Sequence, residues 1–409
     1  MERVILHCDL NNFFASVECL SHPEYRDVPI AVAGSKEDRH GIILAKNELA
    51  KARGVVTAEA IWQAERKCPG LVLVPPHYED YARLSRMVTE IYLEYTDQVE
   101  PFSIDECWLD VTGSRTLFGD GEHIAHTIRN RVKNELGLTV SIGVSFNKVF
   151  AKLGSDYKKP DAVTVISREN YRDILFPLPV NSLLFVGKST VGKLNTFGIK
   201  TIGDLAGCDK ALLTDLLGSH GETLYTHANG LDKEPVRRFD EEDDPKSVGK
   251  GITFRRSLIC EDEVRIGVVA LSDNVAARLR KRNMWCNCVQ ITIKDDNLHS
   301  INRQKKLPSS TNLARDICDA AMGLVTANWS YKIPIRMITV TACDLTGSPR
   351  AVQMSLFDAP EPDERAQAIE HSMDDIRSRF GKGAVQFGTV LGNDIGVNTG
   401  EKKEKTDED

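Results

Sequence analysis

The sequence is short of the features that mark membrane, secreted and zinc-binding proteins. No apolar run reaches the roughly 18 to 20 residues that a membrane-spanning helix needs, and the N-terminus lacks the basic-then-apolar pattern of a signal peptide. The ten cysteines are scattered, apart from Cys286 and Cys288, and form no Cys-x-x-Cys pair or Cys/His cluster with zinc spacing. These absences predict a cytoplasmic protein with reduced cysteines and no membrane segment.

Charge is unevenly distributed along the chain. The 409 residues exceed what one hydrophobic core serves, so more than one domain is expected. The net charge is −7, yet residues 245–350 carry seventeen Lys/Arg against nine Asp/Glu, a net of +8, while residues 358–409 carry a net of −6. The basic segment indicates a polyanion partner, with a solvated basic face as the alternative.

Hydrophobic periodicity divides the chain into four regions and a tail. Strands and helices alternate up to about residue 165, which predicts an α/β domain. Residues 170–230 are expected to form short helices joined by glycine turns, of the helix-hairpin-helix kind, with a plain helical hairpin as the alternative. An acidic linker is predicted at 232–244 and a β-α-β-β-α-β domain at 245–346. In the tail, a helix over 364–380 is predicted without an assigned role.

Acidic residues mark two places in the first region. Asp9 lies where the first strand ends and a helix begins, so on this stretch alone Asp9 or Asn11 is expected to cap the helix. Asp105 and Glu106 lie in a predicted hairpin, where Ser103 favours a turn that lets both acids face one site. Three acids at one place need a cation, and oxygen ligands suit Mg²⁺ or Mn²⁺. Two such ions are the parts of in-line phosphoryl transfer.

Three motifs occur in order: Asp-Leu-Asn-Asn-Phe-Phe-Ala-Ser-Val-Glu from Asp9, Ser-Ile-Asp-Glu from Ser103, and the stretch from Ser141 to Lys-Lys-Pro160. Together they resemble the Y-family translesion DNA polymerases, of the DNA polymerase IV and UmuC type, over roughly residues 3–358. The resemblance implies an α+β multidomain, right-hand fold. Its parts are a palm of 1–165 with small fingers inserted at about 13–74, a helical thumb of 166–231, a little finger of 245–346, and a tail of 347–409.

The resemblance also implies which residues act on the nucleotide. Asp9, Asp105 and Glu106, with the backbone carbonyl of Leu10, would hold two Mg²⁺ ions, with Mn²⁺ as the alternative metal. The nucleotide-binding residues would be Phe13, Phe14, Lys51 and Lys159. Phe14 falls on the steric-gate position that rejects a ribose 2′-OH; without the resemblance, it would read as a core aromatic.

The fingers depart from the usual family pattern. Many relatives have Tyr-x-x-Arg where this chain has Glu48 and Lys51. Lysine supplies a point charge without the bidentate fork of arginine. Lys46 is a competing candidate for the triphosphate contact.

The implied partners are primer-template DNA, a dNTP and the bacterial sliding clamp, and the protein is expected to be a monomer. The predicted DNA contacts are Lys250, Arg255, Arg256 and Arg336, and the predicted clamp-binding peptide is 353–357, with Gln353, Leu356 and Phe357 as its anchors. The expected function is low-fidelity, template-directed translesion synthesis. The alternatives are a non-catalytic scaffold that binds DNA and the clamp, which the retained acids speak against, and a palm-type nucleotidyl cyclase, which would leave the thumb without a purpose.

Overall fold

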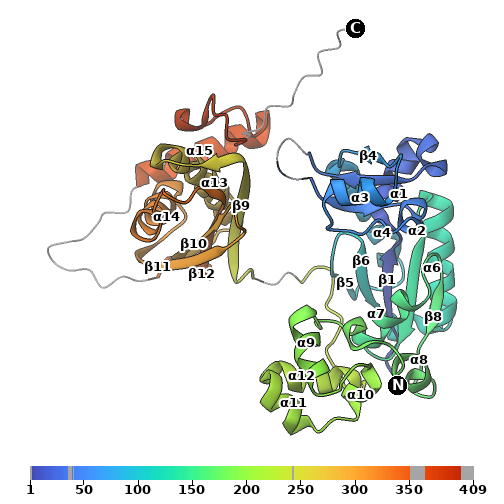
Figure 1. The fold of residues 1–409 in the computed structure, drawn as a ribbon. Coiled ribbons are helices and arrows are strands. Elements are labelled where there is room, and N and C mark those ends of the chain that lie inside the picture. Colours follow the sequence, from blue (N-terminus) through green and yellow to red (C-terminus); the bar gives the residue numbers. More distant parts are fainter. Residues whose placement is uncertain (1, 36–38, 40, 242–243, 351–363, 398–409) are drawn as a thin grey trace. The chain divides into compact units, whose positions relative to one another are not determined.

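The computed structural model describes residues 2–35, 39, 41–241, 244–350 and 364–397 (Figure 1). The peptide predicted to bind the clamp, 353–357, lies outside the described residues. The chain forms two compact units, the first made of residues 1–34 and 42–242 and the second of residues 35–41 and 243–409. Each unit contains both helices and sheet, as the sequence predicted.

A five-stranded sheet with the order β5-β6-β1-β7-β8 organises the first unit. The strands are Ile5–Leu10 (β1), Val99–Pro101 (β5), Glu106–Asp110 (β6), Val140–Ser145 (β7) and Val163–Val165 (β8). Alternate side chains of β1 face opposite ways: Leu6 and Cys8 join the core beneath helices α4 (Tyr78–Leu93) and α6 (Gly121–Leu136). Ile5 lies in another cluster with Ala151 of helix α7 (Lys148–Tyr157). Both faces of β1 are therefore buried, which explains its apolar sequence.

Glycine lets α7 lie close against β7. A Cβ atom added at Gly143 would lie 1.9 Å from the carbonyl oxygen of Ala151 and 2.5 Å from the amide nitrogen of Ser155. Such distances exclude any side chain at this position. The close approach fixes the helix that carries Lys152.

A smaller, three-stranded sheet follows the first helix, α1 (Phe13–Ser21). Its order is β3-β2-β4, from Ile30–Ala33 (β2), Ile43–Lys46 (β3) and Val72–Val74 (β4), with helices α2 (Glu48–Ala52) and α3 (Ile61–Lys67). The expectation that Asp9 or Asn11 caps α1 is wrong. Asn12 is the N-cap residue, in the left-handed conformation (φ 48°), and its side chain makes no cap hydrogen bond; it donates to Glu48 instead.

Short helices form the predicted thumb region around a core that they share with α7. They are Tyr171–Leu175 (α8), Lys188–Thr196 (α9), Ile202–Ala206 (α10), Lys210–Leu217 (α11) and Ser219–Ala228 (α12). The chain after α12 stays with the first unit, because Val236 is 2% exposed and packs beside Ile5 and Trp108. The backbone amide of Arg237 donates to Glu100 at 3.0 Å, which fixes this segment to β5.

The second unit has the predicted β-α-β-β-α-β order. Its elements are β9 (Ser247–Leu258), α13 (Glu261–Lys281), β10 (Trp285–Asp295), β11 (Ser300–Thr311), α14 (Ala314–Asn328) and β12 (Ile335–Thr346). The sheet runs β11-β10-β12-β9 (Figure 1). Side chains of α13 and α14 pack with those of the strands in one core.

The predicted C-terminal helix is present as α15 (Glu364–Phe380) and docks on the second unit. Arg280 of α13 is 5% exposed and donates to Glu370 and, at 2.6 Å, to Asp374. Further along, Val390 and Ile395 are buried in the same core as the sheet. The tail between 364 and 397 is thus a structural part of the second unit. Among the described residues, no helix is long and apolar enough to cross a membrane.

Candidate active site

Strand pairing brings two of the predicted acids together. β1 and β6 are antiparallel, and their register places Asp9 directly opposite Glu106. Cross-strand neighbours project to the same face of a sheet. Both side chains therefore lie on the face that α7 covers.

The third acid stands in the turn before β6. The hydroxyl of Ser103 donates to the Asp105 carboxylate at 2.6 Å and accepts from the amide of Glu106 at 3.1 Å. The amide of Leu10 donates to the carbonyl of Asp105 at 3.0 Å, which fixes this turn beside the end of β1. The predicted turn at Ser103 is confirmed, and it gathers the three acids at one edge of the sheet.

A lysine faces each of the two strand acids. Lys159 Nζ lies 2.7 Å from Asp9 Oδ2, and Lys152 Nζ lies 2.7 Å from Glu106 Oε2. Burial raises the pKa of Asp9 to about 6, against the pull of Lys159. Burial acts in the same direction on Glu106, but the Lys152 ammonium helps to outweigh it and the pKa of Glu106 falls to about 2.

A buried histidine lies behind Glu106. Burial lowers the pKa of His7 to about 4, so the ring is neutral at pH 7. The Ser155 hydroxyl donates to the Lys152 carbonyl at 2.8 Å, and His7 Nδ1 lies 2.8 Å from the same hydroxyl oxygen. His7 Nε2 faces Glu106 Oε2 at 3.5 Å. His7 and Lys152 together lower the pKa of Glu106 against the effect of burial.

Asp105 and Glu106, but not Asp9, line a cavity of about 440 Å³ together with Leu10 and one side of α4. In the described part of the chain, no three Asp, Glu, His or Cys side chains are grouped closely enough to hold a metal ion as they stand. The reason is local, since Asp9 and Glu106 each face an ammonium and Asp105 accepts from Ser103. Carboxylate oxygens alone, already neutralised by cations, nevertheless form the donor set that Mg²⁺ or Mn²⁺ takes.

The two predicted phenylalanines differ in exposure. Phe13 is 2% exposed and its ring belongs to the core of the five-stranded sheet, while its role in nucleotide binding stays a prediction. Phe14 is half-buried and stacks on Tyr81, with ring centroids 4.1 Å apart and planes 12° apart.

The two lysines that were predicted to contact the triphosphate each have a partner within the protein. Lys51 Nζ lies 3.2 Å from Glu48 Oε1, and the same carboxylate oxygen accepts from the Asn12 amide at 2.8 Å. Lys46 Nζ donates to the Thr57 hydroxyl at 3.0 Å, and burial lowers the pKa of Lys46. Glu48 thus ties α2 to the N-cap of α1, a role that the sequence did not reveal.

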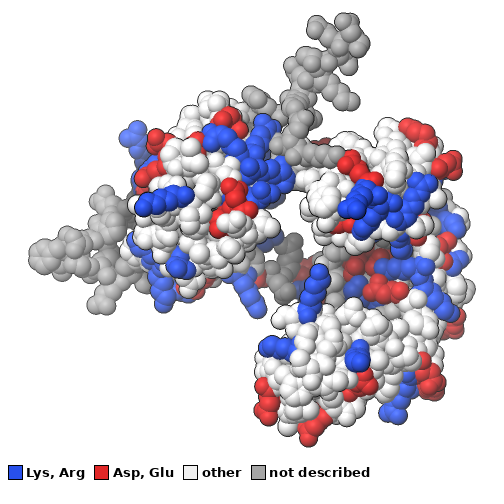
Figure 2. All heavy atoms as spheres, in the orientation of Figure 1, with Lys and Arg blue, Asp and Glu red and all other residues white. Residues whose placement is uncertain are grey.

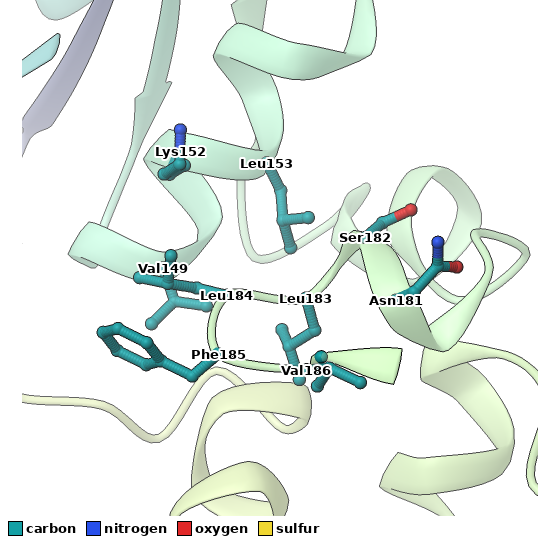
Figure 3. A pocket seen from close by; sticks show the side chains of 10 residues that line it. Val149, Lys152, Leu153, Asn181, Ser182, Leu183, Leu184, Phe185 and Val186 are labelled. Carbon is teal, nitrogen blue, oxygen red and sulfur yellow. The ribbon is translucent and has the colours of Figure 1, made fainter. Parts of the chain in front are cut away.

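A second cavity, of about 480 Å³, lies between α7 and the loop of residues 181–187 before α9 (Figure 3). Lys152 and Leu153 line it from α7, and Leu184 and Phe185 line it from this loop. Phe185 is 61% exposed and has a left-handed backbone (φ 69°), which L residues adopt at a cost. The predicted glycine turn at Gly187 forms the N-cap of α9.

The four predicted DNA contacts of the second unit do not share one face of the sheet. Lys250 pairs with the buried Val340, which places it on the side of the helices. Arg256 also turns to the helix side, where it contacts Glu263 of α13 at 2.7 Å and Asp394 at 2.8 Å. Arg255 lies beside the C-terminal segment: its amide donates to the Ile395 carbonyl at 3.0 Å and its side chain lies against Gly396. Arg336 lies in the irregular pairing between Ile335 and Met337.

The opposite face of this sheet is polar. It carries Gly249 and Gly251 of β9, which pair with Thr341 and Thr339 of β12, and Thr292 of β10, which pairs with Asn302 of β11. Figure 2 shows Lys and Arg side chains gathered over part of the second unit. Sequence reasoning located this basic domain but could not assign side chains to faces, because that requires the register.

Sequence reasoning also missed Lys152 and His7 as neighbours of Glu106. Lys152 lies within the third motif, four residues after Lys148. This helical spacing was the feature from which a second lysine on the same helix face could have been predicted. Lys148 instead makes a buried ion pair with Glu100 of β5 at 2.9 Å. His7 gave no signal, since one histidine in an apolar strand is usually a core residue.

Known protein families, curated relatives and a solved structure match this chain. The model of the impB/mucB/samB family matches residues 8–156, and that of its C-terminal domain matches residues 245–356. DNA polymerase IV of Acetivibrio thermocellus is 48% identical over 97% of this chain and 100% of its own. DNA polymerase IV 1 of Bacillus subtilis is 37% identical over 95% of this chain and 93% of its own. A solved Y-family DNA polymerase chimera has a TM-score of 0.72 at 23% identity, covering 83% of this chain and 98% of its own, which shows the fold.

The two matched family domains and the relatives that cover nearly the whole chain place it in the class of right-hand DNA polymerases. More particularly, the chain belongs to the impB/mucB/samB family, the Y-family DNA polymerases. It is a DNA-directed DNA polymerase of the translesion kind, with DNA as substrate and a general need for a divalent metal.

Proposed function

We propose that this polymerase joins a dNTP to a primer 3′-OH at the edge where β1 and β6 end. The pairing of Asp9 with Glu106, and the turn that adds Asp105, carry this proposal. In it, the five-stranded sheet is the palm and the three-stranded sheet the fingers. Helices α8 to α12 are the thumb, and the second unit is the little finger.

Asp9, Asp105, Glu106 and the carbonyl of Leu10 would hold two Mg²⁺ ions. When bound, the ions activate the primer hydroxyl and stabilise the leaving pyrophosphate. Because Lys159 and Lys152 neutralise Asp9 and Glu106 beforehand, the acids stay gathered without mutual repulsion. When metal ions bind the carboxylates, the two lysines would leave them. The freed ammonium groups could then contact the phosphates of the substrate.

Lys159 would then contact the triphosphate, and the Phe14 ring would lie under the sugar and clash with a 2′-OH. In the fingers, Lys51 is the first candidate for a further phosphate contact and Lys46 the second. Lys51 must leave Glu48 to make this contact.

The polar face of the second unit suits the backbone of a duplex. The side chains of Thr341 and Thr339 on β12 lie over Gly249 and Gly251 of β9. Their hydroxyls can donate to a phosphate, and such contacts position the DNA without reading its sequence. Arg255 and Arg336 remain candidates for this surface, whereas Lys250 and Arg256 point to the helix side. In the thumb, the N-terminus of α9 beside Gly187 offers backbone N–H groups to a phosphate.

We further propose that residues 353–357 bind the bacterial sliding clamp through Gln353, Leu356 and Phe357, and that the protein acts as a cytoplasmic monomer. This peptide follows the little finger directly in the chain. The cyclase and the non-catalytic scaffold are not favoured, because the relatives that match nearly the whole chain are DNA polymerases.

The test is Asp105→Ala in the full chain, measured by primer extension and by DNA binding. Loss of the metal-facing carboxylate should abolish extension while DNA affinity changes little. Asp80→Ala, which removes an acid of α4 that pairs with Arg83 at 3.1 Å, is the matched control and should extend like the parent. Substantial extension by Asp105→Ala would remove Asp105 from the metal site.

A further inference from the structure

An unassigned carboxylate is buried one helical turn after Phe14. Glu18 follows Phe14 by four residues on α1, so the two side chains lie on the same face of the helix. Glu18 is 2% exposed. Since burying a carboxylate is costly without hydrogen bonds, its partners show what it holds.

Both partners of Glu18 come from the beginning of α4. The Tyr81 hydroxyl donates to the Glu18 carboxylate. His77, the N-cap residue of α4, places Nδ1 3.0 Å from both Glu18 oxygens. Burial raises the pKa of Tyr81, so the hydroxyl keeps the proton that it donates. Glu18 thus ties the start of α4 to the helix that carries Phe14.

The Tyr81 ring is the wall against which Phe14 lies. Tyr81 is fully buried, and its ring stacks on Phe14 with centroids 4.1 Å apart and planes 12° apart. Tyr78 meets both rings nearly edge-on, at 6.1 Å from Phe14 and 5.9 Å from Tyr81. The position of the Phe14 ring therefore depends on a neighbour whose own position is set by a hydrogen bond to Glu18.

We propose that Glu18 and Tyr81 are positioning residues for sugar selection: Glu18 holds the Tyr81 hydroxyl, and the Tyr81 ring holds Phe14 in the plane where it meets the 2′ position. The proposal rests on the proposed role of Phe14 as the sugar gate. A steric gate excludes the 2′-OH only if its ring stays in place. The Phe14 ring tilts less when the Tyr81 ring behind it is itself held in position. Neither residue contacts the nucleotide in this account.

A purely structural tie between α1 and α4 predicts something different. Breaking it would lower thermal stability and leave the preference between deoxyribose and ribose unchanged. The ratio of kcat/KM for a dNTP to kcat/KM for the matching rNTP separates the two roles.

The experiment measures this ratio by single-nucleotide insertion with the full chain, together with Tm for each variant. Tyr81→Phe removes only the hydroxyl and should lower the ratio on the order of tenfold, because small displacements of a positioned group cost at least such factors. Glu18→Gln keeps an acceptor and should lose less. Tyr78→Phe removes a hydroxyl from the 56% exposed neighbour in the same cluster and should keep the parent ratio.

Phe14→Ala completes the set. It should lower the ratio most, and adding Tyr81→Phe to it should cause no further loss, since the two substitutions act through one ring. If Tyr81→Phe and Glu18→Gln keep the parent ratio while Phe14→Ala lowers it, Glu18 is only a structural tie and the proposal is overturned. If Phe14→Ala also keeps the ratio, the gate itself is misassigned and the proposal falls with it. Extension by the parent in the same assay reports on polymerase activity separately.

Discussion

At the scale of single residues, the site pairs each strand acid with a lysine before substrate arrives. Lys159 and Lys152 each lie 2.7 Å from a carboxylate oxygen, and both come from the segment that follows β7. Such pairs keep like charges together in a partly buried place, where unpaired carboxylates would repel each other. They also leave two ammonium groups within reach of a triphosphate.

Replacing Lys159 by Ala should therefore weaken use of the nucleotide. We expect kcat/KM for a correctly paired dNTP to fall by about 10²-fold, as when a single donor to a developing charge is removed. Lys158→Ala, which changes the exposed preceding residue, should stay near the parent value. Steady-state single-nucleotide insertion measures kcat/KM for both variants. An unchanged kcat/KM for Lys159→Ala would exclude Lys159 as a contact of the triphosphate.

At the scale of elements, the position of α7 decides where Lys152 lies. The helix rests on β7 at Gly143, where backbone and helix leave no room for a side chain. The same helix contributes Phe150 to the core of the thumb helices. A displacement of α7 would therefore disturb the acidic edge and the thumb together.

Gly143→Ala tests this dependence. The added methyl group would force α7 away from the sheet, so we expect the free energy of unfolding to fall by about 1 to 3 kcal/mol, as for other overpacked sites. Gly192→Ala on α9 is the matched control, because a Cβ there meets no atom within 4 Å; it should be neutral or slightly stabilising. Thermal unfolding gives Tm for both variants. Equal Tm values would show that α7 can move to accommodate the methyl group without loss of stability.

Most elements were predictable, because strands and helices here follow their periodicity. The whole β-α-β-β-α-β unit and the helix over 364–380 are examples. Long-range pairings were not predictable: the lysine opposite each acid, the side of the sheet to which Arg256 turns, and the burial of Phe13 all depend on register and packing. The cap of α1 was misassigned because a cap read from one stretch ignores partners that are distant in sequence, such as Glu48 for Asn12.

At the scale of the whole molecule, we assign the proposed catalysis and the proposed duplex binding to different compact units. The first contains the acidic edge, and the second carries the polar sheet face and the docked tail. Anchoring α15 through Arg280 fixes the chain after residue 363, and β12 fixes it before residue 347. The proposed clamp peptide lies between these two anchors in the sequence.

Replacing Gln353, Leu356 and Phe357 together by Ala should abolish binding to the sliding clamp and leave distributive synthesis intact, because the acids lie in the other unit. Clamp pull-down and extension without clamp measure the two effects. Replacing Arg365, an exposed residue of α15, by Ala is a control that should keep clamp binding. Unchanged clamp affinity in the triple variant would exclude this peptide as the binding site.

Extension of a primed template by the purified full chain tests the central claim most directly. With Mg²⁺ and one dNTP at a time, we expect addition chiefly of the nucleotide complementary to the template base, and no addition once EDTA has removed the metal. Nucleotide addition that ignores the template, or no addition with any dNTP in the presence of Mg²⁺ or Mn²⁺, would contradict the account.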